Sequence, residues 1–309
     1  MRFVFFVVLV VGSFFGPLAV GNTDTREWSL ADGTTFSAAL TSYDVESGEV
    51  LMEFDDSTRD RSYPFDAFST IDRAWLVEWS EFSMHLETLV EELGGELVYF
   101  RTQGQYPTDV YVYYPSAHAN SSKRLPGMLL FNAGGKPGRY LMRHVEAAEA
   151  ADLVIVALGS FRNNKGAVLE DGFTARFIEI LPILKAEVIL DTDRLFLGGN
   201  SGGAWRAFEY SYRFPGPWAG IYSNGGHLGY HDEAFYDNPP PYPAGMRIAM
   251  VNGNNDFNNK VIDGSSRALH SRDCKVAVFS FEGGHQVPPP DAQLKGFNWL
   301  LEQEDFDEE

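Results

Sequence analysis

Ser201 lies in the stretch Leu195-Phe196-Leu197-Gly198-Gly199-Asn200-Ser201-Gly202-Gly203-Ala204, where an apolar run precedes the serine and a helical segment follows it. A G-x-S-x-G sequence between a strand and a helix is typical of a sharp turn that lifts the serine hydroxyl above the end of a sheet. The alternative interpretation is an ordinary glycine-rich turn. We interpret the stretch as a strand, a nucleophilic serine at residue 201 and a helix.

A serine hydroxyl is a weak nucleophile at neutral pH, so it needs a base to take its proton and an acid to orient that base. We predict His285 as the base, because it follows the strand-like run 276–281 across a short loop with two glycines. We predict Asp256 as the acid, because it closes the polar turn after the apolar run 247–251. The alternatives downstream of the serine are His227, His231 and His270 for the base, and Asp232, Asp237, Asp263 and Glu282 for the acid.

The remaining polar residues are expected in other roles. Asp263 is expected near a helix start, where it would cap the helix. His85, His118 and His144 precede the serine and are expected at the surface.

Acyl transfer at a serine also needs two N–H donors for the charge that develops on the carbonyl oxygen. Gly202 provides one by its position after the serine, and we expect the second from Gly134 or Gly135, after the apolar run that ends at Asn132. A plain tight turn is the alternative at these two glycines. This chemistry requires no metal and no organic cofactor.

His227 and His231 have a spacing that could suggest a pair of metal ligands. Their glycine-rich surroundings do not predict a helix, and no third ligand accompanies them. We therefore expect them in a loop or a pocket wall.

From residue 96 to 302, strand-like runs alternate with helical patterns. Strands are expected at 96–101, 108–114, 127–132, 153–158, 194–197, 218–223, 246–252 and 275–281, and helices at 140–151, 172–186 and 291–301. Two early strands followed by alternating strands and helices predict an α/β fold, with a mostly parallel sheet and helices on both faces. An acidic tail, residues 303–309, follows this domain.

The region 22–80 has a different pattern. Short strand-like runs at 34–43, 50–54 and 62–65 are separated by polar turns, which predicts a small antiparallel β-barrel. Apolar residues at helical spacing then predict an amphipathic linking helix over 81–95.

Residues 1–21 combine one arginine, an apolar run and small residues at Ala19 and Gly21, which is typical of a secretory signal peptide cleaved after Gly21. An uncleaved membrane anchor is the alternative, although two glycines, a serine and a proline interrupt the apolar run. We therefore expect a secreted or periplasmic protein with no membrane association after cleavage.

The composition narrows the possible partners. A net charge of −19 argues against nucleic acid and anionic membrane surfaces as partners. Cys274 is the single cysteine, so no internal disulfide can form, and we expect it to be a buried, unreactive thiol.

Arg26-Glu27-Trp28, Asp32-Gly33 and the run 65–72 carry a first resemblance. On these residues the N-terminal region is similar to the Sla-type homology domain, a small barrel of the Src-homology-3 kind. The resemblance implies an accessory domain without catalytic residues, which could contact a cell surface or another protein.

The runs 108–115 and 191–204 and the triplet Gly283-Gly284-His285 carry a second resemblance. The chain from about 96 to 302 resembles the secreted serine esterases of the α/β-hydrolase superfamily, in particular the poly(3-hydroxybutyrate) depolymerase-like and feruloyl-esterase-like group. That similarity implies hydrolysis of a small-molecule or polymer ester through an acyl-enzyme.

Two departures from that group leave the substrate open. The sequence Asn132-Ala133-Gly134-Gly135 stands where many members carry a His-Gly-rich loop, and no polymer-binding module is evident. Two other functions remain alternatives: a peptidase or acyl-aminoacyl hydrolase with the same triad, and a catalytically silent hydrolase fold that acts as a binding module.

Overall fold

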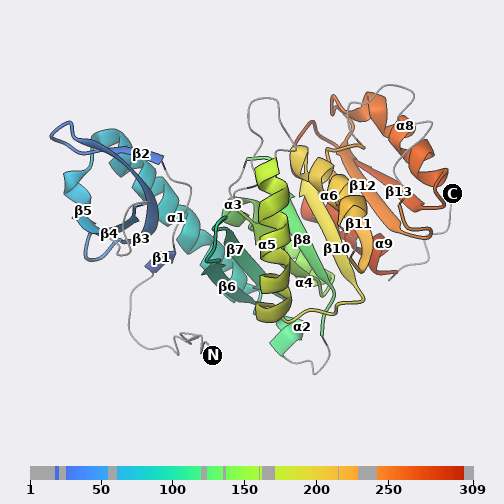
Figure 1. Ribbon diagram of the computed structural model, residues 1–309, viewed down its shortest axis with the longest axis horizontal. Coiled ribbons are helices and arrows are strands. Elements are labelled where there is room, and N and C mark those ends of the chain that lie inside the picture. The colour runs from blue at the N-terminus through green and yellow to red at the C-terminus, as the bar shows by residue number, and fades with distance from the viewer. Residues whose placement is uncertain are drawn as a thin grey trace. The chain divides into compact units, whose positions relative to one another are not determined.

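The computed structural model describes residues 18–20, 26–54, 61–119, 124–134, 137–159, 161, 171–214, 216–228 and 242–302. The chain divides into two compact units, Met1–Met84 and His85–Glu309, and the boundary lies within helix α1 (Thr70–Glu92) (Figure 1). Most of the predicted signal peptide and all of the acidic tail lie outside the described residues. Within the described part, no helix has the length and apolar character needed to cross a membrane.

The first unit contains an antiparallel sheet, as its pattern of short strands predicts. The long strand β3 (Thr35–Asp44) pairs with β2 (Arg26–Ser29) along its first half and with β4 (Glu49–Glu53) along its second half. β4 pairs in turn with β5 (Arg61–Pro64). The short strand β1 (Leu18–Val20) pairs with the end of β3, so cleavage after residue 21 would remove it.

Aromatic side chains fill the core of this unit. Trp28 and Phe68 are fully buried and lie edge to face, with ring centroids 5.5 Å apart. The Trp28 indole N–H donates to the carbonyl of Ala38 at 2.9 Å, so the buried polar atom of this ring has a partner. Leu76 and Trp79 on the first half of α1 complete the same core.

Helix α1 begins at Thr70, after the short 3-10 turn η1 (Phe65–Ala67), and not near residue 81 as the periodicity alone predicts. The cause is a capping arrangement at Ser69. The Asp72 N–H donates to Ser69 Oγ at 3.2 Å, and the Ser69 hydroxyl donates to Asp72 Oδ2 at 3.1 Å. Asp72 Oδ2 also accepts the Ser29 N–H, which ties the helix start to β2.

The second unit contains an eight-stranded mixed sheet in the order β13-β12-β11-β10-β8-β9-β7-β6. β6 and β7 form an antiparallel hairpin, β7 runs antiparallel to β9, and the other neighbours are parallel. The strands are β6 (Glu96–Arg101), β7 (Asp109–Tyr114), β8 (Gly127–Asn132), β9 (Val154–Leu158), β10 (Leu195–Asn200), β11 (Trp218–Asn224), β12 (Arg247–Gly253) and β13 (Lys275–Phe281). The predicted strands are all present, within one residue at each end, except that β10 extends three residues beyond its predicted end.

Helices cover both faces of this sheet (Figure 1). One hydrophobic core joins the sheet to α5 (Asp171–Glu187), α6 (Gly202–Arg213) and α8 (Asn259–His270). The connection from β8 to β9 moves along the sheet in one direction, whereas the later connections, from β9 onward, move in the opposite direction. Because crossovers between parallel strands are right-handed, the helices between β8 and β9 lie on the face opposite to α5, α6 and α8. That face holds α3 (Pro137–Leu141), α4 (Val145–Ala150) and α9 (Pro290–Leu301), while α2 (Ser116–Ala119) follows β7.

One predicted helix, over 140–151, is broken into α3 and α4. The break has a physical cause at His144, whose ring Nδ1 donates to the Tyr140 carbonyl at 2.8 Å. The backbone N–H of His144 donates instead to the Leu141 carbonyl, three residues back and not four, which forms a tighter 3-10-type turn. His144 is fully buried, so its expected surface position is wrong.

The strand order reverses next to β8, because the chain leaves β8 for β9 on one side and then returns to β10 on the other. In open α/β sheets, ligands bind beyond the carboxyl ends of the strands at such a switch point. Ser201 follows β10 at this end of the sheet, and residues 133–134 follow β8 there. The topology therefore places the sequence-predicted serine at the expected edge.

Candidate active site

Ser201 occupies a strained turn between β10 and α6. Its φ is 53° and its ψ is −118°, a conformation that residues with a side chain rarely adopt. The turn is held by glycines, since a Cβ on Gly199 would overlap the backbone of Gly203 and a Cβ on Gly203 would overlap the Phe131 carbonyl. The geometry is that of a serine lifted out of the sheet on a strand-to-helix turn.

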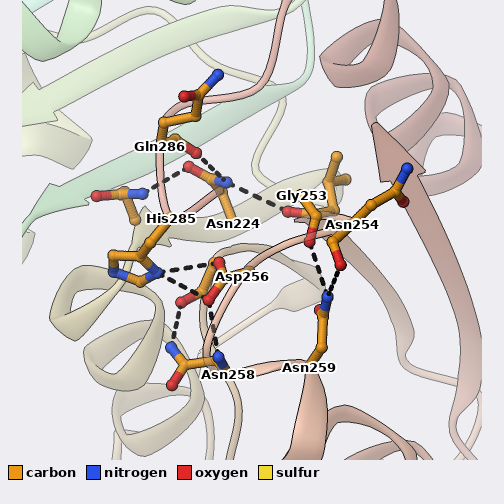
Figure 2. Close-up of polar contacts among 11 residues, drawn as sticks. Asn224, Gly253, Asn254, Asp256, Asn258, Asn259, His285 and Gln286 are labelled. Carbon is orange, nitrogen blue, oxygen red and sulfur yellow. Dashed lines mark hydrogen bonds and ion pairs between the residues drawn. The ribbon is translucent and has the colours of Figure 1, made fainter. Parts of the chain in front are cut away.

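The predicted base and acid lie together in the loops after the last two strands. His285 Nδ1 is 3.0 Å from Asp256 Oδ2 and 3.1 Å from Oδ1 (Figure 2). The Asp256 side chain is 0% exposed and that of His285 is 22% exposed. Because a carboxylate can only accept, Nδ1 carries the proton and leaves Nε2 free to accept one.

The two residues that follow Asp256 in the same turn contact the acid–base pair: one bonds to Asp256 and the other packs against His285. The Asn258 N–H donates to Asp256 Oδ1 at 2.8 Å, which fixes the carboxylate after the end of β12. The ring of Phe257 lies 4.3 Å from that of His285, centroid to centroid, and is 59% exposed. One turn therefore holds the acid and places an aromatic ring against the base.

A glycine pair after β11 lies close to both parts of the site. A Cβ on Gly225 would be 3.2 Å from the His285 ring, and a Cβ on Gly226 would be 3.4 Å from the Ser201 carbonyl oxygen. Among the residues that the structure describes, no hydrogen bond joins the Ser201 hydroxyl to His285. Catalytic contacts of this kind are commonly longer without substrate than in the reacting complex.

The two predicted oxyanion donors differ in the structure. Gly202 opens α6, where the first N–H groups of a helix have no partner within the helix. The N–H of Gly134 instead donates to Asn132 Oδ1 at 2.8 Å, so in this conformation it cannot serve as an oxyanion donor. Gly135 lies outside the described residues.

The structure describes four of the alternative acids and bases, and they have different surroundings. Asp263 is exposed within α8, so its expected role as a helix cap is wrong, since α8 begins at Asn259. Glu282 and His270 are exposed, and His227 is buried near Trp205 with ring centroids 6.0 Å apart. His231, Asp232 and Asp237 lie outside the described residues.

Two buried titratable groups lie elsewhere. Burial lowers the pKa of His144 to about 4, partly opposed by its hydrogen bond to the Tyr140 carbonyl. Burial raises the pKa of the Cys274 thiol to about 11, with a further contribution from Asp273. The prediction of a buried cysteine is confirmed, and a thiol with a raised pKa is a poor nucleophile.

Three asparagines end adjacent strands of the sheet, and one of them, Asn224, was not singled out by the sequence. Asn200 of β10 is in register with Asn132 of β8 on one side and with Asn224 of β11 on the other. The Asn200 carboxamide donates to Asn224 Oδ1 at 2.7 Å. A polar residue directly after an apolar strand is the signal that could have identified Asn224.

Comparisons by sequence give no match: no family model matches the chain, and no curated protein matches it.

Comparisons of structure give many similar folds, although the sequence identities are low. An S-formylglutathione hydrolase from Agrobacterium tumefaciens is 12% identical with a TM-score of 0.53, over 68% of this chain and 95% of that one. The fluorophosphonate-binding serine hydrolase F of Staphylococcus aureus is 12% identical with a TM-score of 0.52, over 67% and 98%. A ferulic acid esterase from Anaeromyces mucronatus is 13% identical with a TM-score of 0.50, over 67% and 89%. With its mixed eight-stranded sheet and the serine turn after β10, the chain shares the α/β-hydrolase fold of these esterases and serine hydrolases.

Proposed function

We propose that this protein is a serine hydrolase that cleaves carboxylic esters through an acyl-enzyme on Ser201. The observation that carries the proposal is the hydrogen-bonded pair of His285 and the fully buried Asp256, held in the loops that follow β13 and β12. The strained conformation of Ser201 at the same end of the sheet supports it. An ordinary glycine-rich turn accounts for neither the strain nor the buried acid–base pair.

In the first step, Ser201 Oγ attacks the ester carbonyl carbon while His285 Nε2 takes the hydroxyl proton. Asp256 keeps the proton on Nδ1 and stabilises the imidazolium that forms. The Gly202 N–H donates to the oxyanion of the tetrahedral intermediate. When the intermediate collapses, the proton passes from Nε2 to the leaving alcohol, and the acyl group remains on Ser201.

In the second step, His285 takes a proton from water, and the hydroxide oxygen attacks the acyl carbon. Collapse of the second intermediate returns the proton to Ser201 and releases a carboxylic acid. The second oxyanion donor comes from the loop after β8. If it is Gly134, its N–H must first leave Asn132 Oδ1.

Labelling with a fluorophosphonate probe tests this proposal. We expect an intact-mass shift of one adduct on the wild type, located on Ser201 by peptide mapping, and no adduct on Ser201→Ala. A panel of short-chain, feruloyl and polymer esters would then define the substrate, with matched peptide substrates testing the peptidase alternative. A wild type that is neither labelled nor active on any ester would favour the silent binding module.

We also propose that residues 1–21 direct export and are removed, so that the mature protein acts outside the cytoplasm. The apolar run after Arg2 and the small residues before Gly21 support this. N-terminal sequencing of the protein recovered from its native compartment tests the proposal, with a start at Asn22 expected. Recovery with Met1 intact would favour the membrane-anchor alternative.

A further inference from the structure

Asn224 links the serine turn to the loop that carries the base. It ends β11, is fully buried, and accepts the Asn200 carboxamide at Oδ1 (2.7 Å). Its own Nδ2 donates to the Gln286 carbonyl and to the Val251 carbonyl, both at 3.2 Å (Figure 2). One buried carboxamide is thus bonded to the residue before Ser201, to the residue after His285 and to β12.

The backbone around Asn224 repeats the connection. Its carbonyl accepts the Ser201 N–H at 2.9 Å, and the N–H of Gly225 donates to the Val251 carbonyl at 3.2 Å. The Gly225 carbonyl accepts the Asn258 carboxamide at 2.8 Å, and Asn258 also holds Asp256. Gly225 has a φ of 54°, and a Cβ there would lie 3.1 Å from Asp256 Oδ2, so the chain passes directly beside the acid–base pair.

We infer that Asn224 is a positioning residue that sets the distance between Ser201 Oγ and His285 Nε2. The inference rests on the proposed function, since it concerns how that triad is assembled. Ser201 and His285 belong to different loops, and no described hydrogen bond joins them directly. A carboxamide is suited to this bridge because it accepts from one side and donates to the other, whereas a carboxylate or an alkyl group cannot do both.

The chain offers a matched control on the neighbouring strand. Asn252 of β12 is also a buried asparagine near a strand end, but among the residues that the structure describes neither its Oδ1 nor its Nδ2 has a hydrogen-bond partner. Asn252→Ala therefore removes a carboxamide of the same size and burial without cutting a bridge. A general effect of losing a buried asparagine should appear in both variants.

The experiment measures kcat and KM on one soluble ester, the rate of fluorophosphonate labelling and the Tm. For Asn224→Ala we expect kcat and the labelling rate to fall by roughly 10²-fold, because small misplacements of reacting groups are this costly. KM should stay within about threefold of wild type, since no substrate contact is removed. Asn252→Ala should keep both kcat and the labelling rate within about twofold.

Asn200→Ala provides a second variant if Asn224→Ala does not fold, because it cuts the same bridge at a half-buried residue. We expect the double variant, Asn200→Ala with Asn224→Ala, to have the same kcat as Asn224→Ala alone, because both residues act through one hydrogen-bonded link. A folded Asn224→Ala or Asn200→Ala with kcat within threefold of wild type would overturn the inference, and so would an equal loss in Asn252→Ala. A wild type without labelling or ester turnover would overturn the proposed function itself, which is a distinguishable result.

Discussion

The two units of the chain differ in how they use buried polar side chains. In the described part of the first unit they are few: Ser80 and Ser83 on α1 donate to carbonyls one turn earlier, and Asp72 accepts the N–H of Ser29. In the second unit they gather at the carboxyl end of the sheet, where Asn224, Asp256 and Asn258 are buried and bond across three loops. Burying polar groups is costly unless they are well paired, so their concentration at one edge supports the active site proposed there.

The largest effect is expected when the proposed nucleophile at that edge, Ser201, is replaced. Ser201→Ala should lower kcat by roughly 10⁴- to 10⁶-fold, because the members of a triad act as a unit. Steady-state hydrolysis of a chromogenic ester measures the effect. Ser211→Ala, on the same helix with its hydroxyl donating to the Phe208 carbonyl, is the control and should retain kcat within about twofold. Near-normal turnover by Ser201→Ala would remove the serine from the mechanism.

Asp256→Asn should have the next largest effect. The substitution preserves shape but removes the charge that stabilises the imidazolium and the acceptor that keeps the proton on Nδ1, and the serine-protease precedent is a loss on the order of 10⁴ in kcat. The same ester assay measures it, with circular dichroism confirming the fold. Asp263→Asn, at an exposed position of α8, is the control. If the control lost activity while Asp256→Asn kept it, the assignment of the acid would be wrong.

These residues could be predicted because their signals are local. Ser201 is marked by the glycines that its turn requires, while Asp256 and His285 follow apolar strands across short polar loops. The bond between Asn132 Oδ1 and the Gly134 N–H is also local, a turn that asparagine commonly makes with the residue two positions on. The start of α1 is marked in the same way by Ser69 and Asp72.

Other features depend on packing that no local pattern carries. Asn224 acquires its role only when β11 lies in register with β10 and the loop after β13 folds over both. His144 has the sequence context of a surface helix, yet it is buried against Tyr140, and its ring replaces a backbone donor there. Burial and register are tertiary properties, so the break between α3 and α4 could not be predicted from periodicity.

A smaller effect, on stability, should follow from His144. Its pKa is lowered to about 4 by burial, whereas an unfolded histidine titrates near 6.5. Above pH 6.5 both states are neutral and the stability is intact. As the pH falls from 6.5 to 4, His144 binds a proton in the unfolded chain but not in the folded chain. The free energy of unfolding should therefore fall by up to about 3 kcal/mol.

Urea unfolding between pH 7 and pH 4 measures this dependence. His144→Asn keeps a donor for the Tyr140 carbonyl but cannot titrate, so its free energy of unfolding should change less over this range than that of wild type. His85→Asn, at an exposed position, is the control and should retain the wild-type dependence. An unchanged pH dependence in His144→Asn would show that other groups are responsible.

The smallest expected effect on turnover comes from the first unit. Trp28 is fully buried among its aromatic side chains, so Trp28→Ala should destabilise that unit by about 3–5 kcal/mol. Every proposed catalytic residue belongs to the second unit, which has a separate hydrophobic core. We therefore expect kcat on a small soluble ester at 25 °C to stay within about twofold of wild type, because a substitution in a separate core is expected to act independently of the site. Phe177→Ala is the matched comparison, because it creates a cavity at a fully buried position in the core of the second unit. Unlike Trp28→Ala, it should lower the temperature at which activity is lost. A Trp28→Ala protein whose second unit stays folded but turns over no ester would show that the first unit contributes to the site, and the contrast between the two units would then be wrong.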